Sequence, residues 1–358
     1  MAKVAGLFSG IGGLEKSFVE QGFELAFVAE VDKHASSVLR WHHPLVPNLG
    51  DVKLLKGADL PEVDVLTFGS PCQDVSRART TQTDGFHDLR SGLVWQVVRL
   101  IAELRRANCL PQVLVWENVG AIIEPKWRSQ YVSIVKAFES HGYAFRAFVE
   151  EARDAGVPQI RPRVVTVFSR LGCNFPATAG RRGGQPKSLS DCILYGAGES
   201  LAEADRARLL GQLYRQRLGA VKRERRTRVE QVETFLGMRP GEEPATWNVS
   251  CVSYSPTYTC TPQVECISTL TRQDSPWVRF PDGTYRQLTA DELELCFGLP
   301  TGYTKVGAGP DRMPWELTEG VRRGLLGNAV VPAAVESVAH WAAMSIGVER
   351  VTMEENSK

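Results

Sequence analysis

Residues 3–14 read Lys-Val-Ala-Gly-Leu-Phe-Ser-Gly-Ile-Gly-Gly-Leu, and this stretch decides the fold. Its first half, Lys3 to Phe8, predicts a buried strand, and apolar residues at helical spacing follow the glycines as far as Gly22. Glycines between a strand and a helix let a ligand approach the backbone while the free amides of the helix point at it. The stretch predicts a nucleotide-type cradle at Ser9–Gly13, although a tight turn without a ligand has the same pattern.

Two acidic residues follow the cradle. The next predicted strand, Leu25 to Ala29, ends at Glu30, about 20 residues after the glycines. A carboxylate at that position binds ribose hydroxyls in dinucleotide-binding folds, which indicates an adenosine-like ligand without a 2′-phosphate. Asp51, after Gly50, is a second carboxylate that can accept from an adenine amino group. Alternatively, Glu30 caps the helix that begins near Lys33.

A single cysteine comes shortly after another predicted strand. The strand Val63 to Phe68 is followed by Gly69-Ser70-Pro71-Cys72-Gln73. Pro71 has no amide hydrogen and a fixed φ, so it ends the strand and places Cys72 in a loop at the strand's carboxyl end, where open α/β sheets bind ligands. A nucleophilic thiol and a small buried hydrophobe both fit this position when it is considered alone.

Polar residues also flank two later strands. Glu117 and Asn118 follow the apolar run 113–116, where an acid can cap a helix, accept structural hydrogen bonds or act as an acid/base group. Gln159, Arg161 and Arg163 are two residues apart and would project from the same side of a strand. This arrangement is costly unless something anionic lies opposite, and a solvated edge strand is the alternative.

Composition places the chain among globular proteins. Of its 358 residues 43% are hydrophobic and 23% are charged, with a formal net charge of +1, which fits one large domain and a smaller one. The eight cysteines form no C-x-x-C pair and do not cluster with histidines at zinc-ligand spacing, so we expect reduced thiols, a cytoplasmic location and no metal. No apolar run approaches membrane-spanning length, and we expect no membrane partner and no export.

The pattern changes after Ser169. Before it, strands and helices alternate, which predicts an α/β domain with a mostly parallel sheet over residues 1–171. We expect a smaller mixed domain over 172–320, a segment 321–348 that returns to the first domain, and a disordered tail at 349–358. Residues 201–239 carry ten basic and five acidic side chains, which indicates helices that meet phosphate, although a solvated helix face would have the same composition.

Together these segments resemble the cytosine-C5 DNA methyltransferases. The motifs occur in the family's order, over the first 170 residues and roughly the last 75: residues 8–13, Glu30, 50–52, 69–73, 117–119, 159–163, 286–289 through 298–300, and Gly327-Asn328-Ala329-Val330-Val331-Pro332. The resemblance implies a Rossmann-like methyltransferase domain that binds S-adenosyl-L-methionine and releases S-adenosyl-L-homocysteine. The middle of the chain, which in this family varies and reads the DNA sequence, would be the target-recognition domain.

The resemblance also implies roles for individual residues. Cys72 would add to C6 of a flipped cytosine, Glu117 would donate a proton at N3, Arg161 would favour the thiolate, and Arg161 with Arg163 would hold the nucleotide. Substrate contacts are implied for Gln73, Ser76, Asn118 and Gln159. The implied cofactor-binding residues are Phe8, Ser9, Gly10, Ile11, Gly12, Gly13, Glu30, Val31, Asp51, Val52, Pro71, Leu93, Asn328 and Ala329.

Three positions depart from the family's usual pattern. Gly6 stands where aspartate is usual, Val75 where phenylalanine is usual, and Phe297 where glutamine is common. These differences concern the geometry of the pocket and of the loop after Cys72, and leave the expected reaction unchanged.

The expected partner is double-stranded DNA, bound by a monomer. A cognate restriction endonuclease is a further candidate partner, and phage self-protection is the alternative context. Three other functions compete: methylation of transfer RNA by a branch of the same family, an inactive relative that only binds DNA, and a thymidylate-synthase-like reaction. The cofactor glycines, the cysteine and the acid argue against the second, and the adenosine cradle argues against the third.

Overall fold

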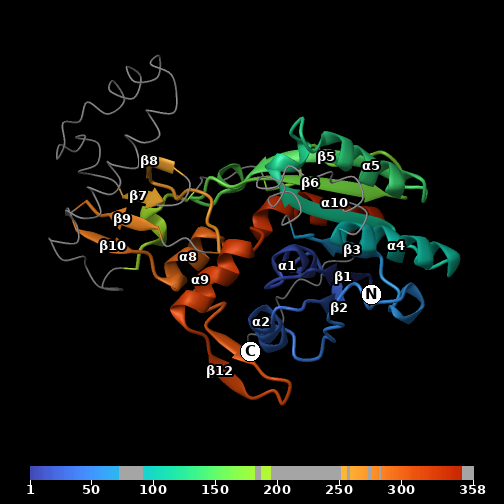
Figure 1. The fold of residues 1–358 in the computed structure, drawn as a ribbon, viewed down its shortest axis with the longest axis horizontal. Helices are drawn as coiled ribbons and strands as arrows, with labels where there is room; N and C mark the ends of the chain where they lie inside the picture. The colour runs from blue at the N-terminus through green and yellow to red at the C-terminus, as the bar shows by residue number, and fades with distance from the viewer. Residues whose placement is uncertain are drawn as a thin grey trace, which may run out of the picture.

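The computed structural model describes residues 1–71, 92–181, 187–194, 251–255, 259–272, 276–281 and 284–348. Among them, six strands form a central sheet in the order β2-β1-β3-β4-β6-β5 (Figure 1). The strands are β1 (Lys3–Leu7), β2 (Glu24–Ala29), β3 (Val65–Phe68), β4 (Val113–Val119), β5 (Ala144–Glu151) and β6 (Pro162–Ser169). Strands β2, β1, β3 and β4 pair in parallel, and β6 runs antiparallel to both β4 and β5. The predicted mostly parallel α/β sheet is confirmed.

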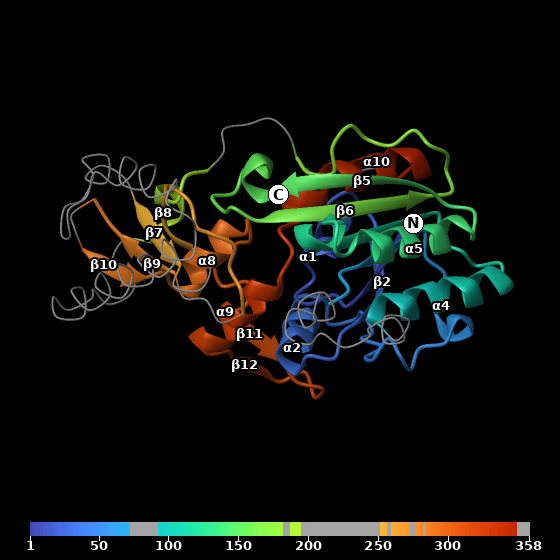
Figure 2. The same ribbon diagram turned by 45° about the horizontal axis from the view of Figure 1, so that its top comes forward.

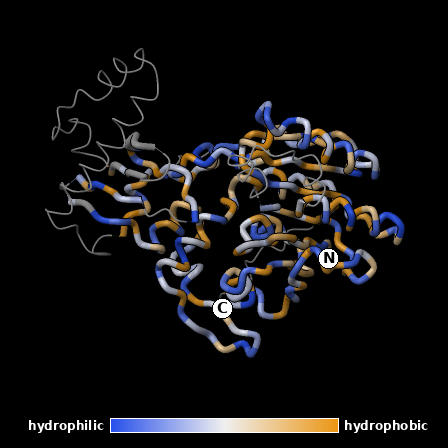
Figure 3. The backbone as a smooth tube through the Cα atoms, viewed as in Figure 1, coloured by the Kyte–Doolittle hydropathy of each residue, from blue (hydrophilic) through white to orange (hydrophobic). Residues whose placement is uncertain are grey.

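Successive residues of the central strands face opposite sides of the sheet. One side packs against α1 (Gly13–Val19) and α10 (Glu336–Ile346), and the other against α4 (Leu93–Arg106) and α5 (Arg128–Glu139). Figure 2 shows α10 on the opposite side of the sheet from α4 and α5, and Figure 3 shows hydrophobic segments along the central strands. With both faces covered, the ends of the strands remain for a ligand site.

A second sheet lies beside the first domain and is antiparallel, in the order β10-β9-β7-β8. It contains β7 (Val252–Ser255), β8 (Thr259–Val264), β9 (Trp277–Arg279) and β10 (Tyr285–Gln287). Helix α8 (Ala290–Cys296) follows, and Thr289 and Glu292 form a capping box at its start. The helices predicted in 201–239 lie outside the described residues, and the domain boundaries stay predictions.

A hairpin from the predicted second domain packs against the first. Its first strand, β11 (Val306–Ala308), lies against α2 (Lys33–His42) and pairs with β12 (Pro314–Glu316). A Cβ atom at Gly307 would lie 2.2 Å from Ser37 Oγ, so this contact requires glycine. Short 3-10 turns complete the described secondary structure at Gly57–Asp59, Gly120–Ile123, Ala152–Ala155, Ser190–Cys192 and Pro332–Val335.

The C-terminal segment returns to the first domain, as expected. Ser17 Oγ of α1 donates a hydrogen bond of 2.8 Å to the carbonyl of Pro332, just before α10. By length and composition, Glu319–Ile346 could cross a membrane, so the expectation that no such run exists was wrong on that criterion. In the structure this segment is α9 (Glu319–Asn328), a 3-10 turn and α10, and Val335 and Val338 are fully buried in the core.

Candidate active site

A cleft of about 450 Å³ opens at the carboxyl ends of β1, β2, β3 and β4. This edge is where open α/β sheets bind ligands. Ten of the predicted cofactor-binding residues line the cleft: Phe8, Gly10, Ile11, Glu30, Val31, Asp51, Val52, Pro71, Leu93 and Asn328. Ser9, Gly12, Gly13 and Ala329 do not line it.

The turn after β1 is held in an unusual backbone conformation. Phe8 has φ +55°, which is uncommon for a residue other than glycine, and its amide donates to the carbonyl of Ala29 at 2.8 Å. Gly12, with φ +86°, is the N-cap of α1. A Cβ atom at Gly13 would lie 2.4 Å from the carbonyl oxygen of Val330, so only glycine allows the C-terminal segment to pack this closely against the start of α1. The predicted cradle is therefore shaped by contacts on both of its sides.

Glu30 bridges the turn and the end of β2. One of its carboxylate oxygens accepts from the Gly10 amide at 2.8 Å, and the other accepts from the Asp32 amide at 2.7 Å. Burial raises the pKa of Glu30 above its usual value, against the effect of these hydrogen bonds. Asp32, and not Glu30, caps α2. Asn48 holds the adjoining backbone, because its side-chain oxygen accepts from the amides of Glu30 and Gly50, each at 3.0 Å.

Glu117 and Arg163 form an ion pair in the same cleft. Arg163 Nε lies 3.0 Å from Glu117 Oε1, and the two side chains are 12% and 10% exposed. A Cβ atom at Gly69 would lie 3.6 Å from the other Glu117 oxygen, which brings the start of the loop after β3 close to the acid. Cys72, Gln73 and Ser76 lie outside the described residues.

Ser70 fixes the entry to that loop. Its hydroxyl accepts from Trp116 Nε1 at 3.1 Å and from Asn118 Nδ2 at 3.3 Å, and its carbonyl also accepts from Asn118 at 3.3 Å. The predicted substrate residue Asn118 therefore lines the cleft while tying the end of β4 to the residue before Pro71.

Arg161 joins three parts of the chain. Its guanidinium donates to the carbonyls of Leu270 at 2.9 Å, Gly327 at 3.1 Å and Ala329 at 2.6 Å, and lies 5.3 Å from the ring centroid of Phe297. The side chain is 3% exposed but borders the cleft. We expected an anionic group opposite Gln159, Arg161 and Arg163, and Arg163 has one in Glu117. The guanidinium of Arg161 binds backbone carbonyls of the second domain and of the C-terminal segment.

Gln159 is fully buried and does not line the cleft. Its backbone forms an isolated bridge with Ile267, and its side-chain amide has no hydrogen-bond partner in the described part of the chain. Gln159 therefore lies at the connection to the second domain, and it does not share the cleft with Glu117 and Arg163.

Replacement of Gly327 by alanine is expected to disturb the place where Arg161 binds the carbonyls of Leu270, Gly327 and Ala329. The added Cβ would lie 2.3 Å from the carbonyl carbon of Thr271, so the backbone must shift, and we expect a loss of about 1–3 kcal/mol in the free energy of unfolding. Urea denaturation would measure it. Gly320→Ala is the matched control, because Gly320 is in the same helix with nothing within 4 Å of the added carbon, and that change should be neutral or stabilising. Equal stability of the two variants would contradict the prediction.

Three residues of the site were not assigned a role from the sequence. Asn48 stands two residues before the motif 50–52 and Ser70 lies within the motif 69–73, but the hydrogen bonds of both side chains depend on the fold. Arg272 comes from the second domain, lines the cleft and lies 3.9 Å from the Asp32 carboxylate, and no local pattern marks it. In the described residues, no group of three His, Cys, Asp or Glu side chains could hold a metal ion.

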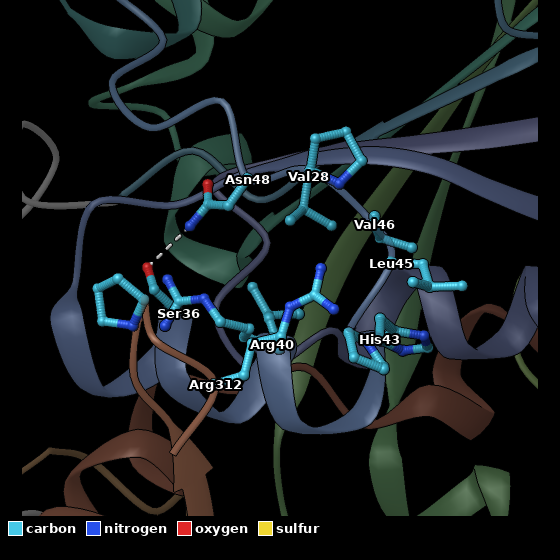
Figure 4. A pocket seen from close by; sticks show the side chains of 12 residues that line it. Val28, Ser36, Arg40, His43, Leu45, Val46, Asn48 and Arg312 are labelled. Carbon is cyan, nitrogen blue, oxygen red and sulfur yellow. Dashed lines mark hydrogen bonds between the residues drawn. The ribbon is translucent and has the colours of Figure 1, made fainter. Parts of the chain in front are cut away.

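A second hollow of about 350 Å³ lies between α2, the loop 43–48 and the tip of the hairpin (Figure 4). Arg40, His43 and Arg312 border it, and burial lowers the pKa of His43. None of the predicted catalytic or cofactor residues lines it. Asn48, which donates to Ser36 Oγ at 2.9 Å, contributes to its wall and also holds the end of β2 beside the first cleft. The first cleft is therefore the candidate active site.

Known proteins resemble this chain in both sequence and fold. A family model described as C-5 cytosine-specific DNA methylase matches residues 2–342. The type II methyltransferase M.Bsp6I of Bacillus sp. (strain RFL6) is 34% identical over 184 residues, covering 49% of this chain and 56% of that protein. M.NgoPII of Neisseria gonorrhoeae is 31% identical over 170 residues, covering 47% and 48%. The match to these curated relatives spans about half of their length.

Solved structures share the fold at low sequence identity. The Entamoeba histolytica methyltransferase EhMeth superposes with a TM-score of 0.63 at 13% identity, covering 97% of this chain and 99% of that one. The S. pombe Dnmt2 methyltransferase gives a TM-score of 0.57 at 14% identity, with the same coverage.

Proposed function

Because this chain belongs to the C-5 cytosine-specific DNA methylases, we propose that it transfers a methyl group from S-adenosyl-L-methionine to C5 of a cytosine in a specific sequence of double-stranded DNA. The observation that carries the proposal is the shared cleft: the glycine turn with Glu30 and the Glu117–Arg163 pair border one cavity. A nucleoside cofactor and a reacting base could therefore meet there.

The residues present fit S-adenosylmethionine. Glu30 can accept from ribose hydroxyls, since each carboxylate oxygen has a second lone pair beyond its bond to a backbone amide. Asp51 at the rim can accept from the adenine amino group. Phe8, Ile11 and Val52 supply apolar surface for the ring, and the cavity volume suits a ligand of this size. When bound, this cofactor supplies an electrophilic methyl group on a sulfonium and leaves as a thioether.

Cys72 is the proposed nucleophile. Its neighbour Pro71 lines the cleft, and one peptide unit separates adjacent Cα atoms by about 3.8 Å. In the proposed step the thiolate forms a bond to C6 of cytosine, N3 takes a proton, and the electron pair moves to C5. C5 would then take the methyl group that the cofactor supplies, with the carbon–sulfur bond breaking as the bond to C5 forms. Loss of the C5 proton to solvent restores the C5–C6 double bond and expels the thiolate from C6, and N3 returns its proton to Glu117.

Glu117 is the proposed proton donor at N3, and Arg163 its positioning partner. The 3.0 Å ion pair and the low exposure of both side chains restrict the carboxyl to one position in the cleft. Gly69 leaves room beside that carboxyl, where a base next to the Cys72 loop could lie. We assign Arg161 a supporting part, because its two terminal guanidinium nitrogens donate to backbone carbonyls of Leu270, Gly327 and Ala329.

The target cytosine must leave the duplex to reach such a cleft, at a cost of about a few kcal/mol. We propose that the second domain, with the basic residues of 201–239, grips the DNA backbone and reads the sequence. The relatives are named type II methyltransferases, which supports a cognate restriction endonuclease as a partner for this chain too. A monomer in the cytoplasm completes the proposal.

Mapping of 5-methylcytosine tests the function. DNA and transfer RNA from cells that express the protein would be treated with bisulfite and sequenced, with an empty-vector strain as the control. We expect methylated cytosines in one short DNA sequence and no new modification in transfer RNA. Methylation of transfer RNA alone would replace the proposal with the RNA function, and no modification of either, with the protein present and folded, would refute it.

A further inference from the structure

A buried acid lies directly beneath the cofactor turn. Glu15, in the first turn of α1, is 1% exposed and does not line the cleft. One carboxyl oxygen, Oε1, accepts from the hydroxyl of Thr67 on β3 at 2.9 Å. The hydroxyl of Ser9, in the turn itself, is a hydrogen-bonding neighbour of this carboxyl and lowers its pKa, as Thr67 does. The other oxygen, Oε2, has no hydrogen-bond partner in the described part of the chain. A buried polar atom without a partner is costly, so its presence calls for a reason.

The carboxyl of Glu15 occupies the space that a side chain on Gly6 would need. A Cβ atom at Gly6 would lie 1.7 Å from Glu15 Oε1 and 2.4 Å from Ser9 Oγ. Glycine on the strand and the acid on the helix therefore depend on each other. The aspartate that the sequence resemblance leads one to expect at Gly6 is absent, and a carboxyl from α1 fills the same place.

We propose that Glu15 is a positioning residue for the cofactor, which supplies from α1 the carboxyl that supports the turn Phe8–Gly12 from inside the protein. The carboxyl could then come from either position 6 or position 15. One of the two positions must supply it, and there is no room for a carboxyl from both. The inference rests on the proposed function, because the turn is assigned to S-adenosylmethionine. When ionised, Glu15 also places a negative charge behind a turn that faces a cationic ligand.

Exchange of the acid between the two positions tests the pair. The measurement is the affinity for S-adenosylhomocysteine by calorimetry, which needs no turnover. Glu15→Ala and Gly6→Asp should each weaken binding at least tenfold, the first by leaving a cavity and the second by crowding two carboxyls together. The double variant should bind within threefold of wild type. A double variant no better than the worse single variant would overturn the proposal.

A control is needed to distinguish a general loss of protein stability from the loss of the carboxyl that supports the turn Phe8–Gly12. Val338→Ala, in the core between α10 and α1, removes buried apolar volume away from the turn. It should lower the melting temperature and leave the affinity for S-adenosylhomocysteine within twofold of wild type. If it weakens binding as much as Glu15→Ala does, the role of Glu15 is merely structural. If wild type itself binds neither cofactor nor product, the proposed function fails and not this inference alone.

The charge of Glu15 gives a second test. Burial raises its pKa from 4.5 to about 7, with Thr67 acting in the opposite direction, so its charge develops between roughly pH 6 and pH 8. Glu30 is the neighbouring acid that adds to this shift, and Tyr303, whose own pKa is raised mainly by burial and partly by Glu15, stays neutral in this range. S-Adenosylmethionine carries a sulfonium charge that S-adenosylhomocysteine lacks, so the ratio of their affinities isolates the electrostatic effect.

We expect that ratio to shift at least threefold toward S-adenosylmethionine between pH 6 and pH 8 in wild type. In Glu15→Gln, which keeps the shape of the side chain but cannot ionise, the ratio should stay constant. An equal shift in both proteins would assign the pH dependence to another group, such as Glu30, and would refute the electrostatic part of the inference.

Discussion

Cys72→Ser is expected to lower the methylation rate by roughly 10⁴-fold or more, because a serine hydroxyl at neutral pH cannot replace a thiolate as the nucleophile at C6. Binding of S-adenosylhomocysteine should stay within a few-fold of wild type, since the proposed cofactor contacts are made by other residues. Single-turnover transfer of a radiolabelled methyl group to duplex DNA that contains the mapped site would measure the loss.

A covalent adduct with modified DNA tests the role of Cys72 without a measurement of rate. In DNA with 5-fluorocytosine at the target position, the fluorine cannot leave as a proton does, so the C6–sulfur bond persists after methyl transfer. Wild type with cofactor should form a complex that survives denaturing electrophoresis, and Cys72→Ser should form none. Cys173→Ser, which changes an exposed thiol, is the control and should trap DNA normally. An adduct that persists in Cys72→Ser would remove Cys72 from the mechanism.

Local pattern was enough to predict the edge of the sheet where the site lies. The strand, glycine turn and helix of residues 3–19 are adjacent in sequence, and the parallel order brings Glu30 and Glu117 to the same edge. This follows because Glu30 comes directly after β2 and Glu117 lies in the last three residues of β4, and the carboxyl ends of parallel strands lie at the same edge of the sheet. The part of the cleft that is formed by residues at the ends of strands therefore lies where the sequence predicted it.

The partners of Arg161 could not be predicted in the same way. Its three carbonyl acceptors are more than 100 residues away in sequence and come from two segments that meet only in the fold. Backbone carbonyls carry no signature in a sequence, so an arginine that binds them looks the same as one that awaits an anion. The close approach that Gly327 permits is visible only when the backbone of Thr271 is in place.

The structure gives a physical reason for glycine at position 6, where the family usually has aspartate. In sequence it is a missing acid, and nothing about Glu15 marks it as the group that fills the same space. The two residues are nine positions apart, one on a strand and one on the helix that folds back over it. Only the packing of α1 on β1 and β3 brings the carboxyl to the Cβ position of Gly6.

Glu117→Gln is expected to lower the rate of methyl transfer by roughly 10²–10⁴-fold, because the amide keeps the shape of the acid but has no acidic proton for N3. Affinity for duplex DNA should change less than threefold, since the side chain is 10% exposed and lies in the cleft with Arg163. Single-turnover rates and fluorescence anisotropy of labelled DNA would be measured on the same preparation.

Two further variants decide whether Glu117 acts in the chemistry or in the structure. Glu124→Gln changes an exposed acid that follows the end of β4, and it should leave both rate and affinity unchanged. Arg163→Lys keeps a positive charge but loses the planar fork that positions the carboxyl, so its rate should fall by a smaller factor than that of Glu117→Gln. If Glu117→Gln instead weakened DNA binding as much as it slowed transfer, the acid would be a structural contact, and the proton at N3 would need another donor.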